Sequence, residues 1–300
     1  MTTVAKVLDR PRRRQVRRLP LVPYAVAAAL LAVGCGSGSD PVRTVVAASI
    51  RTLSQTAGAS LTLTGPGVIS AGRAPVLGRA ASRFTEGTGF EAIDVPGIAG
   101  RPGGRLYLDF LPGSVYLRPI SATSIALPGG KSWVFAPLTS AVDRRFPRFV
   151  LQVEALSPQL LLDEIAWGAE SVASTRQEVV NHVPFRKYQV SVSLVRALAA
   201  AKGPGAAAMR VAIQDELNVL RSTRGRQAST VPVTVWLDGP GHVAQLQADL
   251  PGSGLGHVGF VLSGYGVAVN GSPAEASLLT DLRSVLAPGS SPLASAVVTS

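Results

Sequence analysis

The chain of 300 residues has a single cysteine, Cys35, and only three histidines. One thiol cannot form an internal disulfide, and no histidine or second cysteine lies near it at metal-ligand spacing. Charged residues make up 16% of the chain and aromatic residues 5%, and the charged share is below the usual quarter. A chain this apolar builds a large dry core or lines a cavity for an apolar ligand, and composition alone leaves both open.

The segment before Cys35 predicts export. Residues 1–18 hold seven basic residues and one acidic residue, and the next sixteen residues carry no charge. That apolar run is shorter than the roughly twenty residues that a membrane-spanning helix needs. A basic segment followed by a short apolar one and small residues is typical of a secretory signal. We therefore expect a signal peptide at 1–34 and a flexible tether at 35–40.

Ala32, Val33 and Gly34 lead directly into Cys35, and this segment resembles the bacterial lipobox, although the family usually has leucine where Ala32 stands. The resemblance implies lipidation of Cys35, with a diacylglycerol or acyl anchor and acyl chains such as palmitate. It places the mature protein, exported and lipid-anchored, at the outer face of the cytoplasmic membrane. The alternative is an incidental or buried Cys35 in an uncleaved anchor helix.

The positive charge belongs mostly to this leader. The whole chain carries a net charge of +11, and the part after residue 34 carries +5. Nucleic-acid binding would need a concentrated basic face. The sequence therefore predicts no nucleic-acid partner.

Apolar spacing predicts a few helices among many strands. The segment 40–56 places Val45, Ile50 and Leu53 near helical spacing, and the segment 155–172 offers Ser157 as an N-cap. A third helix is expected at 206–220. Alternation with a period of two predicts strands in five segments: 60–65, 105–118, 129–137, 185–193 and 256–271.

The clearest hairpin spans residues 231–251 and turns at Asp238-Gly239-Pro240-Gly241. A tight turn there predicts the pairs Val235–Ala244 and Val233–Leu246, with both strands agreeing on their apolar face. Many antiparallel strands with a few helices define an α+β chain.

Three ordered segments resemble the LolA-like family of bacterial lipoprotein and lipid carriers, and within it the actinobacterial LprG/LppX-type lipoproteins. They are the valine-rich turn and strand at 179–198, the Trp-Leu-Asp hairpin at Trp236–Asp238, and the closing strand with Tyr265-Gly266. The resemblance implies a strongly curved antiparallel sheet, a half-barrel, with helices on its concave face. It also implies a lipid-binding domain at 41–286, followed by a poorly ordered tail at 287–300.

Catalytic signatures are weak in this sequence. His182, His242 and His257 stand apart from one another and from cysteine, and we assign them to turns or the surface. The stretch GGKS at 129–132 lacks the first glycine of a phosphate-binding loop. Asp163, Glu164 and Glu170 are assigned to a solvated helix face, and the basic runs 143–148 and 221–226 to solvated loops. Trp133, Trp167 and Trp236 are assigned to the core.

These observations predict a protein that is not an enzyme, has no metal or cofactor, and binds lipids or lipidated glycoconjugates for transport or presentation in the cell envelope. The alternatives are an envelope sensor or interaction module with a transport or signalling protein as partner, and an enzyme that modifies envelope lipids or glycans. Eight residues are expected to face inward, towards a lipid cavity or a dry core: Leu106, Leu108, Tyr188, Val190, Val192, Val233, Val235 and Leu246.

Overall fold

A computed structural model of the chain describes nine stretches. They are residues 40–63, 76–95, 104–121, 127–138, 149–180, 182–202, 205–250, 256–266 and 279–281. The predicted signal peptide, Cys35 and the predicted tail lie outside them. None of the helices within these stretches is long and apolar enough to cross a membrane.

The described chain contains five α-helices, two short 3-10 helices and twelve strands. The helices are α1 (Pro41–Leu53), α3 (Phe149–Glu154), α4 (Pro158–Gly168), α5 (Leu194–Ala200) and α6 (Ala206–Arg224), with η2 at Phe84–Glu86 and η3 at Pro128–Gly130. The strands are β1 (Thr56–Leu63), β2 (Val76–Arg83), β3 (Thr88–Val95), β4 (Gly104–Leu111), β5 (Ser114–Ser121), β6 (Trp133–Pro137), β7 (Ala169–Val180), β8 (Val183–Ser193), β9 (Thr230–Leu237), β10 (Val243–Leu250), β11 (Gly256–Ser263) and β12 (Leu279–Asp281).

All twelve strands form one sheet in the order β12-β6-β5-β4-β3-β2-β1-β11-β10-β9-β8-β7. The first eleven strands pair antiparallel, and β12 adds to β6 in parallel. The sheet is strongly curved and unclosed, because β7 and β12 end it without pairing to each other. This α+β architecture confirms the predicted fold class.

Helix α1 forms where the sequence predicted a helix and holds the sheet at one hairpin. The Asp40 side chain accepts a hydrogen bond from the Val42 amide at 3.0 Å and Pro41 occupies the first turn. At the other end, the Thr52 hydroxyl accepts a bond from the Val243 amide at 3.0 Å. Val45 is buried as expected, but Ile50 is 46% exposed, because Ala48, Ser49 and Thr52 occupy the buried face instead.

Helix α4 begins as predicted, with the Ser157 hydroxyl accepting a bond from the Gln159 amide and Pro158 in the first turn. It ends earlier than predicted. A Cβ on Gly168 would lie 2.5 Å from the carbonyl oxygen of Ser193, so the chain passes too close to the end of β8 to continue as a helix. Residues 169–180 become the edge strand β7, which the sequence analysis had not identified as a strand.

The β9–β10 hairpin is present, but the predicted register is wrong. Val235 pairs with Leu246 and Val233 with Ala248, because the register shifts between Val243 and Gln245. The bulge inserts one residue in β10. It lets Val243 face Leu237 next to the turn while Val235 and Leu246 stay on the buried face.

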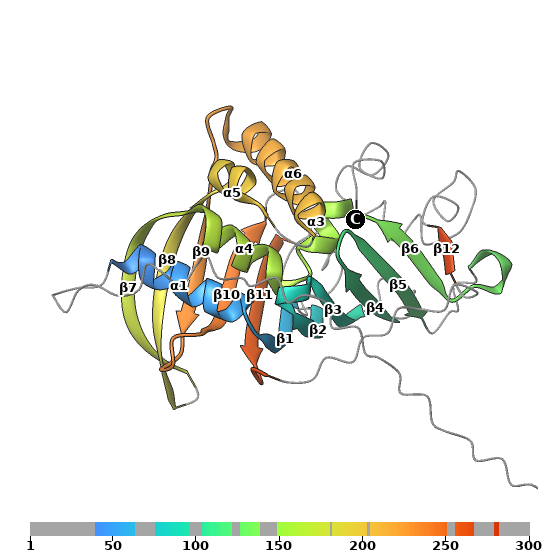
Figure 1. The fold of residues 1–300 in the computed structure, drawn as a ribbon, viewed down its shortest axis with the longest axis horizontal. Coiled ribbons are helices and arrows are strands. Elements are labelled where there is room, and N and C mark those ends of the chain that lie inside the picture. The colour runs from blue at the N-terminus through green and yellow to red at the C-terminus, as the bar shows by residue number, and fades with distance from the viewer. Residues whose placement is uncertain are drawn as a thin grey trace, which may run out of the picture. The chain divides into compact units, whose positions relative to one another are not determined.

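A helix layer covers one face of the sheet (Figure 1). Helices α1 and α4 pack against each other and across β7–β10, while α5 and α6 continue the layer and α3 packs on α6. The buried side chains of these helices and of strands β1–β11 form one apolar core. The helix layer and the sheet therefore depend on each other for burial.

We expect Gly168→Ala to lower the free energy of unfolding by roughly 1–3 kcal/mol, because the new methyl group would have to displace the backbone of Ser193. Gly239→Ala is the matched control, since a Cβ there meets no atom within 4 Å. Denaturant unfolding of both variants measures the difference. Equal stabilities would contradict the close packing of α4 on β8.

Candidate functional site

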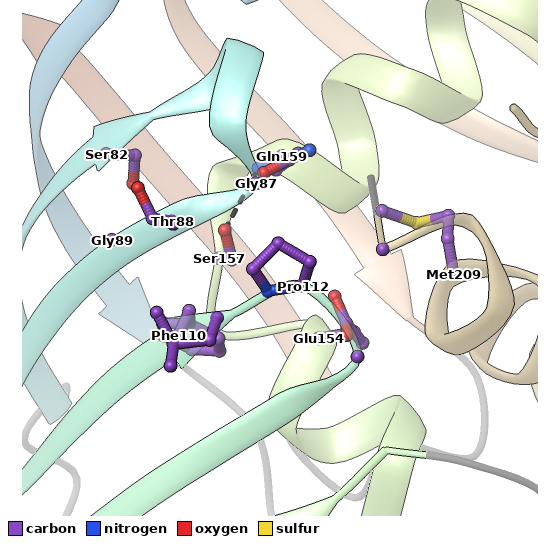
Figure 2. A pocket seen from close by; sticks show the side chains of 13 residues that line it. Ser82, Gly87, Thr88, Gly89, Phe110, Pro112, Glu154, Ser157, Gln159 and Met209 are labelled. Atoms are coloured by element: carbon purple, nitrogen blue, oxygen red, sulfur yellow. Dashed lines mark hydrogen bonds between the residues drawn. The ribbon is translucent and has the colours of Figure 1, made fainter. Parts of the chain in front are cut away.

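A pocket lies where the ends of two strand hairpins meet the helix layer (Figure 2). It encloses about 30 Å³ and opens to solvent. Its walls come from the β2–β3 and β4–β5 turns, the junction of α3 and α4, and the start of α6. The lining residues are Ser82, Gly87, Thr88, Gly89, Phe110, Leu111, Pro112, Gly113, Glu154, Ser157, Gln159, Gly205 and Met209.

The pocket is amphipathic. Polar groups come from Ser82, Thr88 and Gln159, whereas Phe110 and Met209 supply apolar surface that is continuous with the core. Gly89 lets the chain pass close to Ser82 in one wall of the pocket, because a Cβ on residue 89 would lie only 2.9 Å from the Ser82 hydroxyl. The lining combines polar and apolar groups, while the enclosed space is about that of one or two water molecules.

Glu154 is the ionisable residue of the pocket wall. Burial, and to a lesser extent the nearby charge of Asp163, raises the pKa of Glu154 to about 7. A carboxyl group with this pKa can accept or donate a hydrogen bond near neutral pH. It therefore suits a hydroxyl-rich or amide-bearing head group.

Two acidic residues predicted for a solvated helix face are instead buried in the helix layer. Asp163 and Glu164 are buried, at 7% and 0% exposure, whereas Glu170 is exposed and belongs to β7. Leu161, Leu162 and Ile165 of α4 are buried as well, so the helix is covered on nearly every side. Its polar positions cannot all reach solvent, which is why the prediction of a solvated face fails.

Glu164 of α4 faces Glu216 of α6, and both side chains are fully buried. Burial and the charge of Glu216 hold the pKa of Glu164 well above its usual range, and burial raises the pKa of Glu216 to about 7. A proton shared by the pair can hydrogen-bond one carboxyl group to the other, but no other group of the described residues pairs with their four oxygens. Buried polar groups without partners are costly, so this contact weakens the α4–α6 interface.

A fourth buried acid lies on the covered face of the sheet. Glu91 of β3 is 0% exposed and its two carboxyl oxygens have no hydrogen-bond partner within the described stretches. Burial holds its pKa well above the usual range. One of its oxygens lies 3.1 Å from the position of a Cβ on Gly78, so the glycine provides the space that this carboxyl occupies.

The eight predicted inward residues all belong to the core region. Seven are at most 2% exposed, and Leu106 is half-buried and packs against them. None of the eight lines the pocket. That they contact lipid stays a prediction. The pocket residues could not be predicted, because they belong to turns and helix ends, where no periodic pattern indicates which side chains point inward.

His242 has a carboxylate partner but lies outside the pocket. Its ring Nδ1 is 3.4 Å from Asp238 Oδ2, its Nε2 is 3.2 Å from the Gln55 amide nitrogen, and its ring stacks on Tyr265. Tyr265 in turn donates a hydrogen bond to the Val243 carbonyl. These contacts join α1 to the β9–β10 turn.

His257 lies 3.0 Å from Asp249 on the exposed surface, and His182 occupies the β7–β8 turn with a φ of 65°. Neither lines the pocket. In the described residues no group of three or more His, Cys, Asp or Glu side chains could hold a metal ion.

The tryptophans and basic runs have mainly structural surroundings. Trp236 is 5% exposed, Trp167 packs on the core, and Trp133 is half-buried with the Arg118 guanidinium 5.7 Å from its ring centre. The basic run at 221–226 is exposed at the end of α6. The run at 143–148 lies outside the described stretches.

Three solved structures are similar to this chain, all at low identity. LprF from Mycobacterium bovis has 13% identity and a TM-score of 0.43, over 80% of this chain and 100% of its own. The lipoprotein LppX from Mycobacterium tuberculosis has 14% identity and a TM-score of 0.38, over 77% and 99%. A LolA superfamily protein from Nitrosomonas europaea has 6% identity and a TM-score of 0.23, over 77% and 93%.

These proteins are of the kind that the sequence resemblance named. No protein-family model and no curated protein matches the chain. The site is therefore interpreted from its own geometry.

We expect the protein to lose stability as the pH rises from about 4.5 to about 7. In the unfolded chain Glu216 ionises near its ordinary pKa of 4.5, whereas in the folded chain it stays protonated up to about pH 7. Over this interval the folded state binds more protons, so ionisation favours unfolding. Asp163 and Glu154, with pKa values of about 7 for the same reason, act in the same direction.

Glu216→Gln should flatten this pH dependence and stabilise the protein at pH 8 by roughly 1–3 kcal/mol, because the amide keeps the shape but cannot ionise. Glu170→Gln, at an exposed position, should leave the pH profile unchanged. Denaturant unfolding at pH 5 and pH 8 provides the measurement. A Glu216→Gln profile as steep as that of the unchanged protein would rule out the buried pair as its source.

Proposed function

We propose that this protein is an extracytoplasmic lipoprotein, anchored through Cys35, that binds lipids or lipidated glycoconjugates for transport or presentation in the cell envelope. The observation that carries the proposal is the amphipathic pocket at the edge of the helix–sheet core. Polar groups line it beside Phe110 and Met209, which are continuous with the apolar interior. A lipid head group would occupy the pocket while its acyl chains enter the core.

Transfer of acyl chains from water supplies the free energy for this binding, at about 0.8 kcal/mol for each buried methylene. The pocket encloses about 30 Å³, far less than the roughly 300–1,000 Å³ of small-molecule sites. A lipid with several long chains therefore requires the helix layer to separate from the sheet. The Glu164–Glu216 contact is a weak point of this layer, since no group of the described residues other than the pair itself satisfies these buried carboxyl groups.

In this mechanism α6 moves away from α4, and α4 moves away from β8 and β10, which it contacts. The inward residues of these strands and of the intervening β9 become the walls of the opened cavity. The carboxyl groups of Glu164 and Glu216 would then reach water or polar groups of the ligand. No cofactor takes part, and binding is passive. The nonpolar walls select for chain length and volume, and the pocket selects the head group.

An envelope sensor or interaction module is the second candidate. The observation that favours it is the filled core, in which seven of the eight predicted cavity residues are at most 2% exposed. A core that never opens would bind no lipid, and the curved sheet would serve as a rigid support for a protein contact.

Co-purified lipid distinguishes the two candidates. The protein and its Met209→Trp variant are extracted under denaturing conditions, and bound lipid is measured by mass spectrometry. The tryptophan should fill the pocket and lower the amount of bound lipid about tenfold or more, the loss expected from about 1.4 kcal/mol of affinity. Met209→Leu keeps the volume and should retain lipid. The proposed site would be refuted if the unchanged protein carried no lipid, or if it and both Met209 variants carried equal amounts.

Cys35→Ala should block lipidation, and the chain should accumulate as an unacylated precursor of higher mass than the mature form. Metabolic labelling with a fatty acid, followed by mass analysis of the N-terminus, tests this. Normal maturation of the variant would contradict the anchor.

A further inference from the structure

The β7–β8 hairpin extends beyond the rest of the sheet. Pairing between β8 and β9 ends at Arg186–Leu237, whereas β7 and β8 continue to pair through Val179–Pro184 and Val180–Val183. Residues 179–180 and 182–185 therefore form a two-stranded ribbon end, beside which no third strand lies among the described residues. Figure 1 shows this hairpin reaching past the end of β9.

The ribbon end is apolar on both of its faces. Val179 and Pro184 form one pair and Val180 and Val183 the next, and successive pairs point to opposite faces. Val179 is 68% exposed and Val183 is 48% exposed. A ribbon of two strands has no interior, so these side chains cannot be buried within the hairpin itself.

The base of the ribbon end is held firmly. Trp236 Nε1 donates a hydrogen bond of 2.9 Å to Glu178 Oε2, and the Lys187 ammonium lies 3.4 Å from the same oxygen. That ammonium also lies 4.5 Å from the centre of the Trp236 ring. The cross-strand contacts fix the hairpin to β9 immediately below its apolar end, so the end is held in a defined position.

A positive collar surrounds the apolar end. Residues 176–187 include three basic side chains and one acidic one. Glu178 is engaged by Trp236 and Lys187, and the hydrogen bond from Trp236 is the main reason that its pKa is lowered. Arg176 is 64% exposed, and Arg186 is exposed as well. The charge presented beside the valines is thus cationic.

We propose that the β7–β8 hairpin end, residues 179–185, inserts between the head groups of an anionic bilayer. Apolar side chains at a projecting end gain free energy by entering the interface, and flanking arginines are attracted to anionic lipids. A cationic collar complements such a surface. The proposal takes from the proposed function only the location at a membrane and is independent of lipid binding in the interior.

A dye attached at the hairpin tests the insertion locally. Cys35→Ser removes the one cysteine of the full chain, and Val179→Cys then carries an environment-sensitive fluorophore. The matched controls are Val195→Cys on α5 and Val261→Cys on β11, which replace valines that are 44% and 50% exposed. Each labelled protein is mixed with vesicles of phosphatidylcholine, with or without an equal share of phosphatidylglycerol.

The dye at residue 179 should shift to the blue and brighten about twofold on anionic vesicles, as expected for transfer to the bilayer interface, whereas the dyes at 195 and 261 stay unchanged. Arg186→Gln should raise the lipid concentration needed for a half-maximal response about fivefold. This is the equivalent of about 1 kcal/mol per basic residue near the surface. Equal responses at all three positions, or none at 179, would overturn the proposal.

Two further outcomes are decisive. An equal response on neutral vesicles would refute the requirement for anionic lipid. A response at 179 that appears with membrane extracts but not with protein-free vesicles would refute the lipid surface and assign the hairpin to a protein partner. Failure of lipid co-purification leaves these measurements unaffected, so the two proposals can fail separately.

Discussion

A long open sheet must bury one apolar face without closing on itself, and this constraint governs the rest of the structure. Eleven strands run antiparallel in one continuous order, and their covered side chains are apolar along nearly the whole width. Closure into a barrel would bury both ends of such a sheet. Here the two ends stay open and the helix layer covers the apolar face instead. Thr52 of α1 and Gln55, just after that helix, tie this segment to the β9–β10 hairpin. Helices that cover the sheet are buried on several sides, even where they carry polar side chains.

The buried acids follow from this role of the helices. Helix α4 lies between α1, α5 and the sheet, so Glu164 has no route to solvent and meets Glu216 instead. Buried polar groups without partners lower stability, and natural proteins keep few of them. If the helix layer opens to admit a ligand, as proposed, a contact that is weak in one place makes that opening less costly.

Much of the fold could be predicted from the sequence, because alternation and capping are local. Ser157-Pro158 marked the start of α4, and the alternation around Leu108 marked the β4–β5 hairpin. The β9–β10 register failed because a bulge is not visible in a two-residue period. The exposure of Ile50 and the burial of Glu164 depend on which neighbours pack around a helix. The pocket combines turns from distant segments, so no local pattern could have located it.

The irregular edge strand β7 affects how copies of the protein interact when they are crowded together. It carries mostly exposed polar and charged residues and shifts register twice against β8, between Ala169 and Ser171 and between Val172 and Ser174. An irregular, hydrophilic margin offers a poor template for another chain's backbone. If copies are anchored side by side on one membrane, as proposed, they collide often, at a local concentration far above that in solution. The irregular margin lets them do so without stacking into continuous sheets, so density at the surface need not lead to aggregation.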